Sequence, residues 1–122
     1  MSGITYHLVA AEYFRNAGRD APYTPAGFEA DGFIHCTDGI ANIVDVGNRY
    51  HRDDRRMYVV LVIDTSRVSA PVTYEGAERI YPHIHGPLNR DAIVRVLPIL
   101  RNADGTFRPL KDPRQEGFQP GT

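Results

Sequence analysis

The run Met57-Tyr-Val-Val-Leu-Val-Ile63 is the most apolar stretch of the chain, and it restricts the possible folds more than any other segment. Its length and its β-branched side chains favour a strand over a helix, and the lack of polar residues predicts a central strand that is buried on both faces. The chain has 122 residues, which gives room for one hydrophobic core. We therefore expect a single domain built around this strand.

Other segments predict the remaining elements of the domain. Residues 4–10 alternate in polarity and predict a first strand, while residues 10–17 have helical composition. A second helix is expected over residues 38–51, with the Thr37 hydroxyl as its cap, because apolar side chains recur there at helical spacing. Strands are also predicted over residues 72–75 and 92–97, a hairpin turn over residues 102–105, and irregular loops over residues 18–30 and 81–87.

These elements predict an α+β domain over residues 1–110 with about six strands and two helices, followed by a weakly ordered tail over residues 111–122. Apolar residues make up 42% of the chain, and 14 Lys and Arg nearly balance 15 Asp and Glu, so we expect no nucleic-acid partner. No segment reaches the roughly 20 apolar residues of a membrane span, and the first residues lack a signal-peptide pattern. The single cysteine, Cys36, excludes an internal disulfide and fits a reducing compartment. A cytoplasmic protein without a membrane partner is therefore expected.

The segment Asp31-Gly-Phe-Ile-His-Cys-Thr37 combines features of a functional site. Gly32 allows a sharp turn, and the two apolar residues after it favour a short strand that ends near His35. An imidazole titrates near neutral pH, so His35 is a candidate catalytic residue, with a structural hydrogen-bonding role as the alternative. Cys36 would point to the opposite face of such a strand, so we interpret it as a buried apolar side chain rather than a nucleophile.

Four of the five histidines fall in predicted strands or site-like loops, and the fifth, His51, is interpreted as a solvated helix end. His83 and His85 have the alternate spacing that places two side chains on one face of an extended segment, as in metal sites built on strands. The flanking prolines favour a structural role for this pair, and we expect no bound metal. Glu75 precedes the loop, and a carboxylate beside imidazoles suits proton transfer or stabilisation of positive charge; its alternative role is that of a surface residue. The candidate catalytic residues are His35, Glu75 and His83.

These motifs together resemble the bacterial DUF952 family. The resemblance covers about residues 4–100 and depends on the segments 6–8, 31–37, 74–75 and 81–88. It implies the fold of the ADP-ribosyltransferase superfamily, in which a split mixed sheet surrounds a cleft for a nicotinamide dinucleotide. It further implies that Glu75 orients the acceptor and that His7 contacts the ribose. The family commonly has an aromatic hydroxyl where this chain has His85. The substrate-binding residues expected from the resemblance are His7, Thr37, Tyr81 and His85.

Three interpretations of the function stay open. The resemblance implies an ADP-ribosyltransferase-like enzyme that acts on NAD or an ADP-ribose derivative. The second interpretation is an enzyme on another small molecule that uses His35, Glu75 and His83 as acid-base groups in the same cleft. The third is a catalytically silent module that binds a small molecule. The chain lacks a glycine-rich turn for a pyrophosphate, so NAD is expected from the resemblance alone, and the sequence does not predict an oligomeric state.

Overall fold

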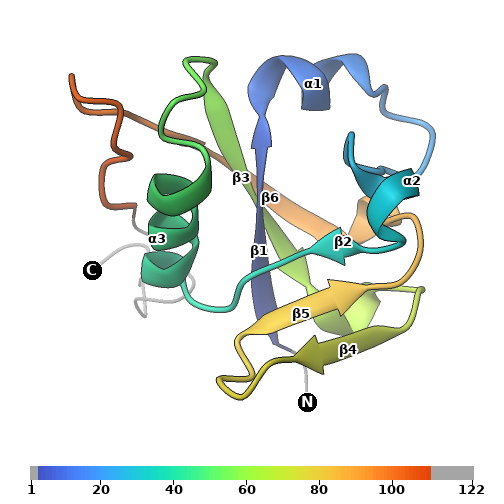
Figure 1. Cartoon of the computed structure of the whole chain (residues 1–122). Helices are drawn as coiled ribbons and strands as arrows, with labels where there is room; N and C mark the ends of the chain where they lie inside the picture. The colour runs from blue at the N-terminus through green and yellow to red at the C-terminus, as the bar shows by residue number, and fades with distance from the viewer. Residues whose placement is uncertain (1–2, 111–122) are drawn as a thin grey trace, which may run out of the picture.

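The computed structural model describes residues 3–110, and Figure 1 shows two three-stranded sheets in this part of the chain. Both sheets contain only antiparallel pairs, so the expected α+β class is confirmed, while the expected mixture of strand directions is not found among the described strands. The tail predicted over residues 111–122 lies outside the described residues. The first sheet has the order β1 (Ile4–Ala10), β3 (Tyr58–Asp64) and β6 (Ile93–Ile99), and the second has the order β2 (Ile34–His35), β5 (Tyr81–Ile84) and β4 (Val72–Glu75).

Strand β3 lies in the centre of the first sheet and is buried on both faces, as the apolar run predicts. Because side chains alternate along a strand, successive residues of β3 enter two separate hydrophobic clusters. The cluster on one face includes the helix α3, and the cluster on the other face includes the buried side of the second sheet. Val60 and Val62 pack with Ile43 and Val44 of α3, and Leu61 and Ile63 pack with Ile34 and Ile84 of the second sheet.

Three α-helices accompany the sheets: α1 (Ala11–Asn16), α2 (Phe28–Asp31) and α3 (Ile40–Tyr50). Two short 3₁₀ turns lie at Thr65–Arg67 and Arg90–Ala92. The helices predicted over residues 10–17 and 38–51 are confirmed, whereas α2 begins inside the segment over residues 18–30 that was expected to be irregular. A helix of four residues is too short to show a helical repeat, and it ends at Gly32, whose φ is 79°. None of the helices in residues 3–110 combines the length and the apolar character needed to cross a membrane.

The prediction that Thr37 caps the second helix is wrong. Thr37 instead forms a bridge with Tyr6 of β1, with its backbone N–H donating to the Tyr6 carbonyl at 2.8 Å and its carbonyl accepting from the Tyr6 N–H at 3.0 Å. The chain then turns at Gly39, which has a φ of 90°, and α3 begins at Ile40 without a side-chain cap. This bridge joins the two sheets, and it brings β2 across β1.

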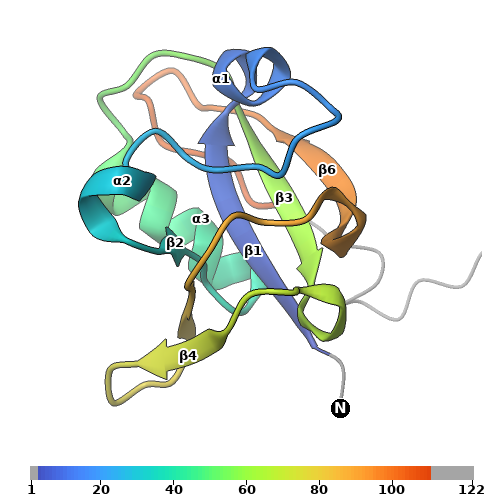
Figure 2. The same cartoon turned by 90° about the vertical axis from the view of Figure 1, so that its right-hand side faces the viewer.

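The prediction of an irregular segment over residues 81–87 is also wrong, because its first half forms β5. The Pro82 carbonyl accepts from the Cys36 N–H at 3.0 Å, so the ring nitrogen of Pro82, which has no hydrogen, faces β2 as well. The return hydrogen bond is therefore missing, and β2 ends at His35. A proline is tolerated in this middle strand because it lies beyond the end of its short neighbour. Figure 2 shows β4 on the outer side of the second sheet, away from β1 and β3.

Candidate functional site

A cavity of about 910 Å³ is lined by residues of β1, of α3 and of the loop that leads into α2. Figure 1 shows α3 on one side of β1 and α2 on the other. The turn between β4 and β5 borders the cavity as well. Its volume lies within the range of roughly 300–1,000 Å³ that is usual for small-molecule sites. The structure brings six of the seven predicted site residues to this cavity, and the seventh, His85, does not line it. The six are His7, His35, Thr37, Glu75, Tyr81 and His83.

His7 lies at the floor of the cavity and is only 6% exposed. Its Nδ1 lies 2.7 Å from the backbone carbonyl oxygen of His35, which can only accept, so Nδ1 carries the proton and donates. Its Nε2 therefore accepts from the Tyr23 hydroxyl at 2.9 Å. Burial lowers the pKa of His7 to about 4 and raises the pKa of Tyr23. His7 is thus neutral at pH 7, and both ring nitrogens have partners within the protein.

His35 and His83 are paired across β2 and β5, so their side chains lie on the same face of the second sheet. Their ring centroids are 5.5 Å apart. The Nε2–H of His35 donates to the Asp31 carboxylate at 3.0 Å, and Asp31 is the last residue of α2. Asp31 therefore fixes the orientation of the His35 ring and leaves Nδ1 as its basic nitrogen. The sequence predicts that His35 and His83 share one cleft, but it does not indicate Asp31 as the partner of His35.

The His83 ring stacks on Phe33, with centroids 3.9 Å apart and an angle of 11° between the planes. Burial lowers the pKa of His83, the nearby His35 lowers it further, and Glu75 acts in the opposite direction. Within residues 3–110, neither ring nitrogen of His83 has a hydrogen-bond partner. His83 therefore presents a neutral imidazole with a free basic nitrogen to the cavity at pH 7.

Glu75 and His85 are connected through Thr73, a residue that the sequence did not single out. The Thr73 hydroxyl lies 3.0 Å from Glu75 Oε2 and 2.7 Å from His85 Nε2. A hydroxyl has one proton and the carboxylate only accepts, so Thr73 donates to Glu75 and receives a hydrogen bond from His85 Nε2–H. The spacing of Thr73 and Glu75, two positions apart on one strand, is the sequence feature that indicates this contact. His85 is therefore connected to Glu75 through Thr73 and is not part of the cavity wall.

The other end of the cavity is lined by His51 and by aromatic and cationic side chains. The expectation that His51 is a solvated helix end is wrong, because it is half-buried, lines the cavity and has its pKa lowered by burial. Its Nδ1 lies 3.4 Å from the Tyr58 hydroxyl, which donates to Asp54 at 2.7 Å. Arg56 binds the same carboxylate at 2.6 Å and holds the pKa of Asp54 well below its usual range.

Cys36 is 2% exposed, and burial raises the pKa of its thiol. It packs in the core of the domain, as expected for a buried apolar side chain. Thr37 is 4% exposed at the crossing of β1 and the segment after β2. Over the described residues, no group of three or more His, Cys, Asp or Glu side chains is arranged to hold a metal ion.

The chain is similar to solved structures and to one sequence family. The crystal structure of protein CC0527 from Caulobacter crescentus superposes with a TM-score of 0.73 at 19% identity, over 87% of this chain and 94% of that chain. The solution NMR structure of CC0527 gives a TM-score of 0.63 at 21% identity, over 84% and 89% of the two chains. At such identities the likeness shows the fold alone. No curated protein matches the chain. The family described as a protein of unknown function, DUF952, matches residues 8–96, so the chain belongs to the DUF952 family.

Proposed function

We propose that this chain is an enzyme that acts on a small molecule in the cavity, with His35 and His83 transferring protons and Glu75 stabilising positive charge. The observation that supports this most directly is the pair of imidazoles from β2 and β5, which lie 5.5 Å apart beside one cavity. Two imidazoles at that separation are within reach of a single reacting group placed between them.

His83 is the general base in this proposal. Its lowered pKa keeps the ring neutral at pH 7, and a ring nitrogen that has no partner among the described residues is available to a substrate O–H or N–H. His35 is the partner acid: Asp31 accepts from Nε2–H at 3.0 Å and stabilises the imidazolium once Nδ1 is protonated. Nδ1–H then donates its proton to a leaving group, and Asp31 keeps the ring in the required tautomer.

Incubating the protein with a mixture of small metabolites, followed by NMR, tests this proposal through depletion of a component. His83→Gln and His35→Gln are expected to lower turnover of that component by roughly 10²- to 10⁴-fold, while its binding is retained. Turnover at the wild-type rate in both variants would exclude proton transfer by these residues. Binding without turnover in the wild-type protein would instead support a silent ligand-binding module.

A second candidate function is transfer of ADP-ribose from NAD, as the resemblance to ADP-ribosyltransferases implies. It is favoured by the volume of the cavity, about 910 Å³, which is large for a small-molecule site, and by the Glu75 carboxylate at its wall. In this reaction the bond between ribose and nicotinamide breaks, and a carboxylate stabilises the positive charge that develops on the ribose. Contact between a ribose hydroxyl and a ring nitrogen of His7 requires the loss of one of the two hydrogen bonds of that ring.

A further inference from the structure

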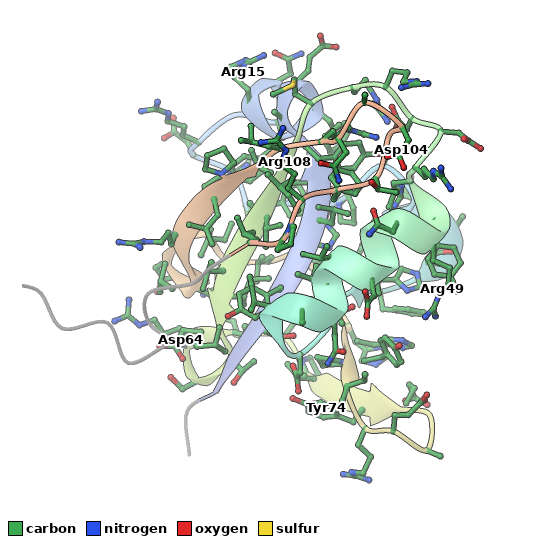
Figure 3. The ribbon with its side chains drawn as sticks, turned by 90° about the vertical axis from the view of Figure 1, so that its left-hand side faces the viewer. Arg15, Arg49, Asp64, Tyr74, Asp104 and Arg108 are labelled. Carbon is green, nitrogen blue, oxygen red and sulfur yellow. The ribbon has the colours of Figure 1, made fainter. Side chains whose placement is uncertain are left out.

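Arg49 has a different environment from the other cationic residue of the cavity wall. Arg56 is neutralised by a hydrogen-bonded ion pair with Asp54. Arg49 lies at the C-terminal end of α3, where it is exposed (Figure 3). It lines the same cavity and forms no ion pair within residues 3–110. Its guanidinium therefore offers an uncompensated positive charge at the opening of the cavity.

Two tyrosines lie beside this guanidinium. The Arg49 Cζ atom is 5.9 Å from the ring centroid of Tyr50, the next residue of α3, which is 68% exposed. The hydroxyl of Tyr50 and then that of Tyr81, which lies on β5, raise the pKa of Arg49. Arg49 thus lies near hydroxyls from two different elements, and all three side chains line the cavity.

We infer that the substrate carries a phosphate group, which binds to Arg49 between the hydroxyls of Tyr50 and Tyr81. The guanidinium has five N–H donors in a planar fork that matches the oxygens of a phosphate, and each tyrosine adds one O–H donor. A carboxylate has only two oxygens to accept from this set, whereas a terminal phosphate has three. The phosphate site deepens the proposed function, because it names the class of substrate that the same cavity takes.

The distribution of charge around the cavity gives the bound substrate a direction. Three carboxylates line the cavity: Asp31 of α2, which accepts from His35 at 3.0 Å, Glu75 at the end of β4, and Glu78 in the turn after β4. A phosphate is attracted to Arg49 and repelled from the end of the cavity that holds Asp31, so the anionic end lies at α3 and the reacting end lies at His35.

Titration with inorganic pyrophosphate, followed by ¹⁵N NMR at low salt, tests the phosphate site without any need for turnover. Pyrophosphate is expected to shift the resonances of the Arg49 side chain and of residues around it in the cavity. Arg49→Gln is expected to weaken its binding roughly 10- to 100-fold, and Arg49→Lys less, because lysine keeps the charge but loses the fork. Acetate at the same ionic strength is expected to bind much more weakly than pyrophosphate.

Arg95→Gln is the matched control, since Arg95 is exposed on β6 and does not line the cavity. Equal weakening in Arg49→Gln and Arg95→Gln, or shifts outside the cavity only, would overturn the site, because binding would then reflect net charge. Acetate binding as tightly as pyrophosphate would overturn the phosphate class. If pyrophosphate binds at Arg49 while no metabolite is turned over, the proposed enzyme activity fails and the phosphate site stands.

Discussion

At the scale of single residues, the hydrogen bonds of His7 make the stability of the domain sensitive to acid. The folded protein holds this imidazole neutral, with a pKa of about 4 against an ordinary 6.5. Between these values the unfolded chain binds a proton that the folded chain does not, so stability falls as the pH falls from 6.5 to 4. The full shift corresponds to about 3 kcal/mol in the free energy of unfolding. Urea denaturation at a series of pH values measures this loss.

The variant His7→Gln is the control for that prediction. Its amide is uncharged at every pH, so the part of the pH dependence that His7 contributes is expected to disappear between pH 6.5 and 4. Carboxylates such as Asp54, whose pKa is lowered by Arg56, lose their contribution only below their unfolded pKa of about 3.8. An unchanged pH dependence in His7→Gln would show that His7 is protonated normally in the folded state.

The hydroxyl of Thr73 is expected to determine the tautomer of His85. In the wild-type protein the proton lies on Nε2, because Thr73 donates to Glu75 and accepts from His85. Thr73→Ser retains this arrangement, whereas Thr73→Val removes the hydroxyl and allows both tautomers of the neutral ring. The ¹⁵N chemical shifts of His85 distinguish these cases, and identical shifts in the wild type and Thr73→Val would contradict the connection.

At the scale of elements, the close approach of α3 to the first sheet depends on Gly47. A Cβ atom at this position would lie 2.7 Å and 2.9 Å from two ring carbons of Phe107, and 3.0 Å from Cδ2 of Leu8. Gly47→Ala gains about 1 kcal/mol of helix propensity, but overpacking of a buried ring costs typically 1–3 kcal/mol, so we expect a net loss of stability. Asp45→Ala on the exposed side of α3 is the control and should change stability by less than about 0.5 kcal/mol. A more stable Gly47→Ala in urea denaturation would show that the Phe107 ring moves and makes room for the added methyl group.

The elements that the sequence predicts well are those with a long apolar pattern. The patterns over residues 57–63 and 4–10 predict β3 and β1, because β-branched runs of this length have few alternative structures. Helix α2 and strand β5 could not be predicted in the same way. One turn of helix has no period, and Pro82 is compatible with β5 only because β2 stops beside it, which is a fact about another part of the chain.

The residues of the candidate site also differ in how well the sequence predicts them. Histidine pairs at alternate positions and the motif around His35 indicate which side chains share a face, and the structure does bring His35 and His83 together. The spacing of Thr73 and Glu75 is a local signal for their contact. The contact of Asp31 with His35 depends on helix α2, which was not predicted, and the cavity position of His51 depends on distant segments, so neither could be predicted. The second hydrogen bond of the His7 ring could not be predicted either, because its partner Tyr23 lies in a loop without periodicity.

At the scale of the whole molecule, the two sheets meet at the bridge between Tyr6 and Thr37, and the cavity lies where α2 and α3 flank β1. A ligand in this cavity contacts both sheets and two helices at once. It can bind only when the whole domain is folded, so its binding free energy adds to the stability of the domain as a unit. Thermal unfolding therefore reports occupancy of the cavity without knowledge of the reaction.

NAD provides the decisive comparison between the two candidate functions. At 100 times its dissociation constant, a ligand that binds only the folded state adds about 2.7 kcal/mol, which raises the melting temperature of a domain of this size by several degrees. If ADP-ribose transfer is the function, NAD produces this shift at millimolar concentration. Glu75→Gln then retains the shift and loses turnover, because the carboxylate stabilises charge in the transition state rather than the bound substrate. If NAD, ADP-ribose and nicotinamide all leave the melting temperature unchanged, ADP-ribose transfer is excluded. A phosphorylated metabolite that does shift it, in the wild type and less in Arg49→Gln, would then identify the substrate class of the acid-base enzyme.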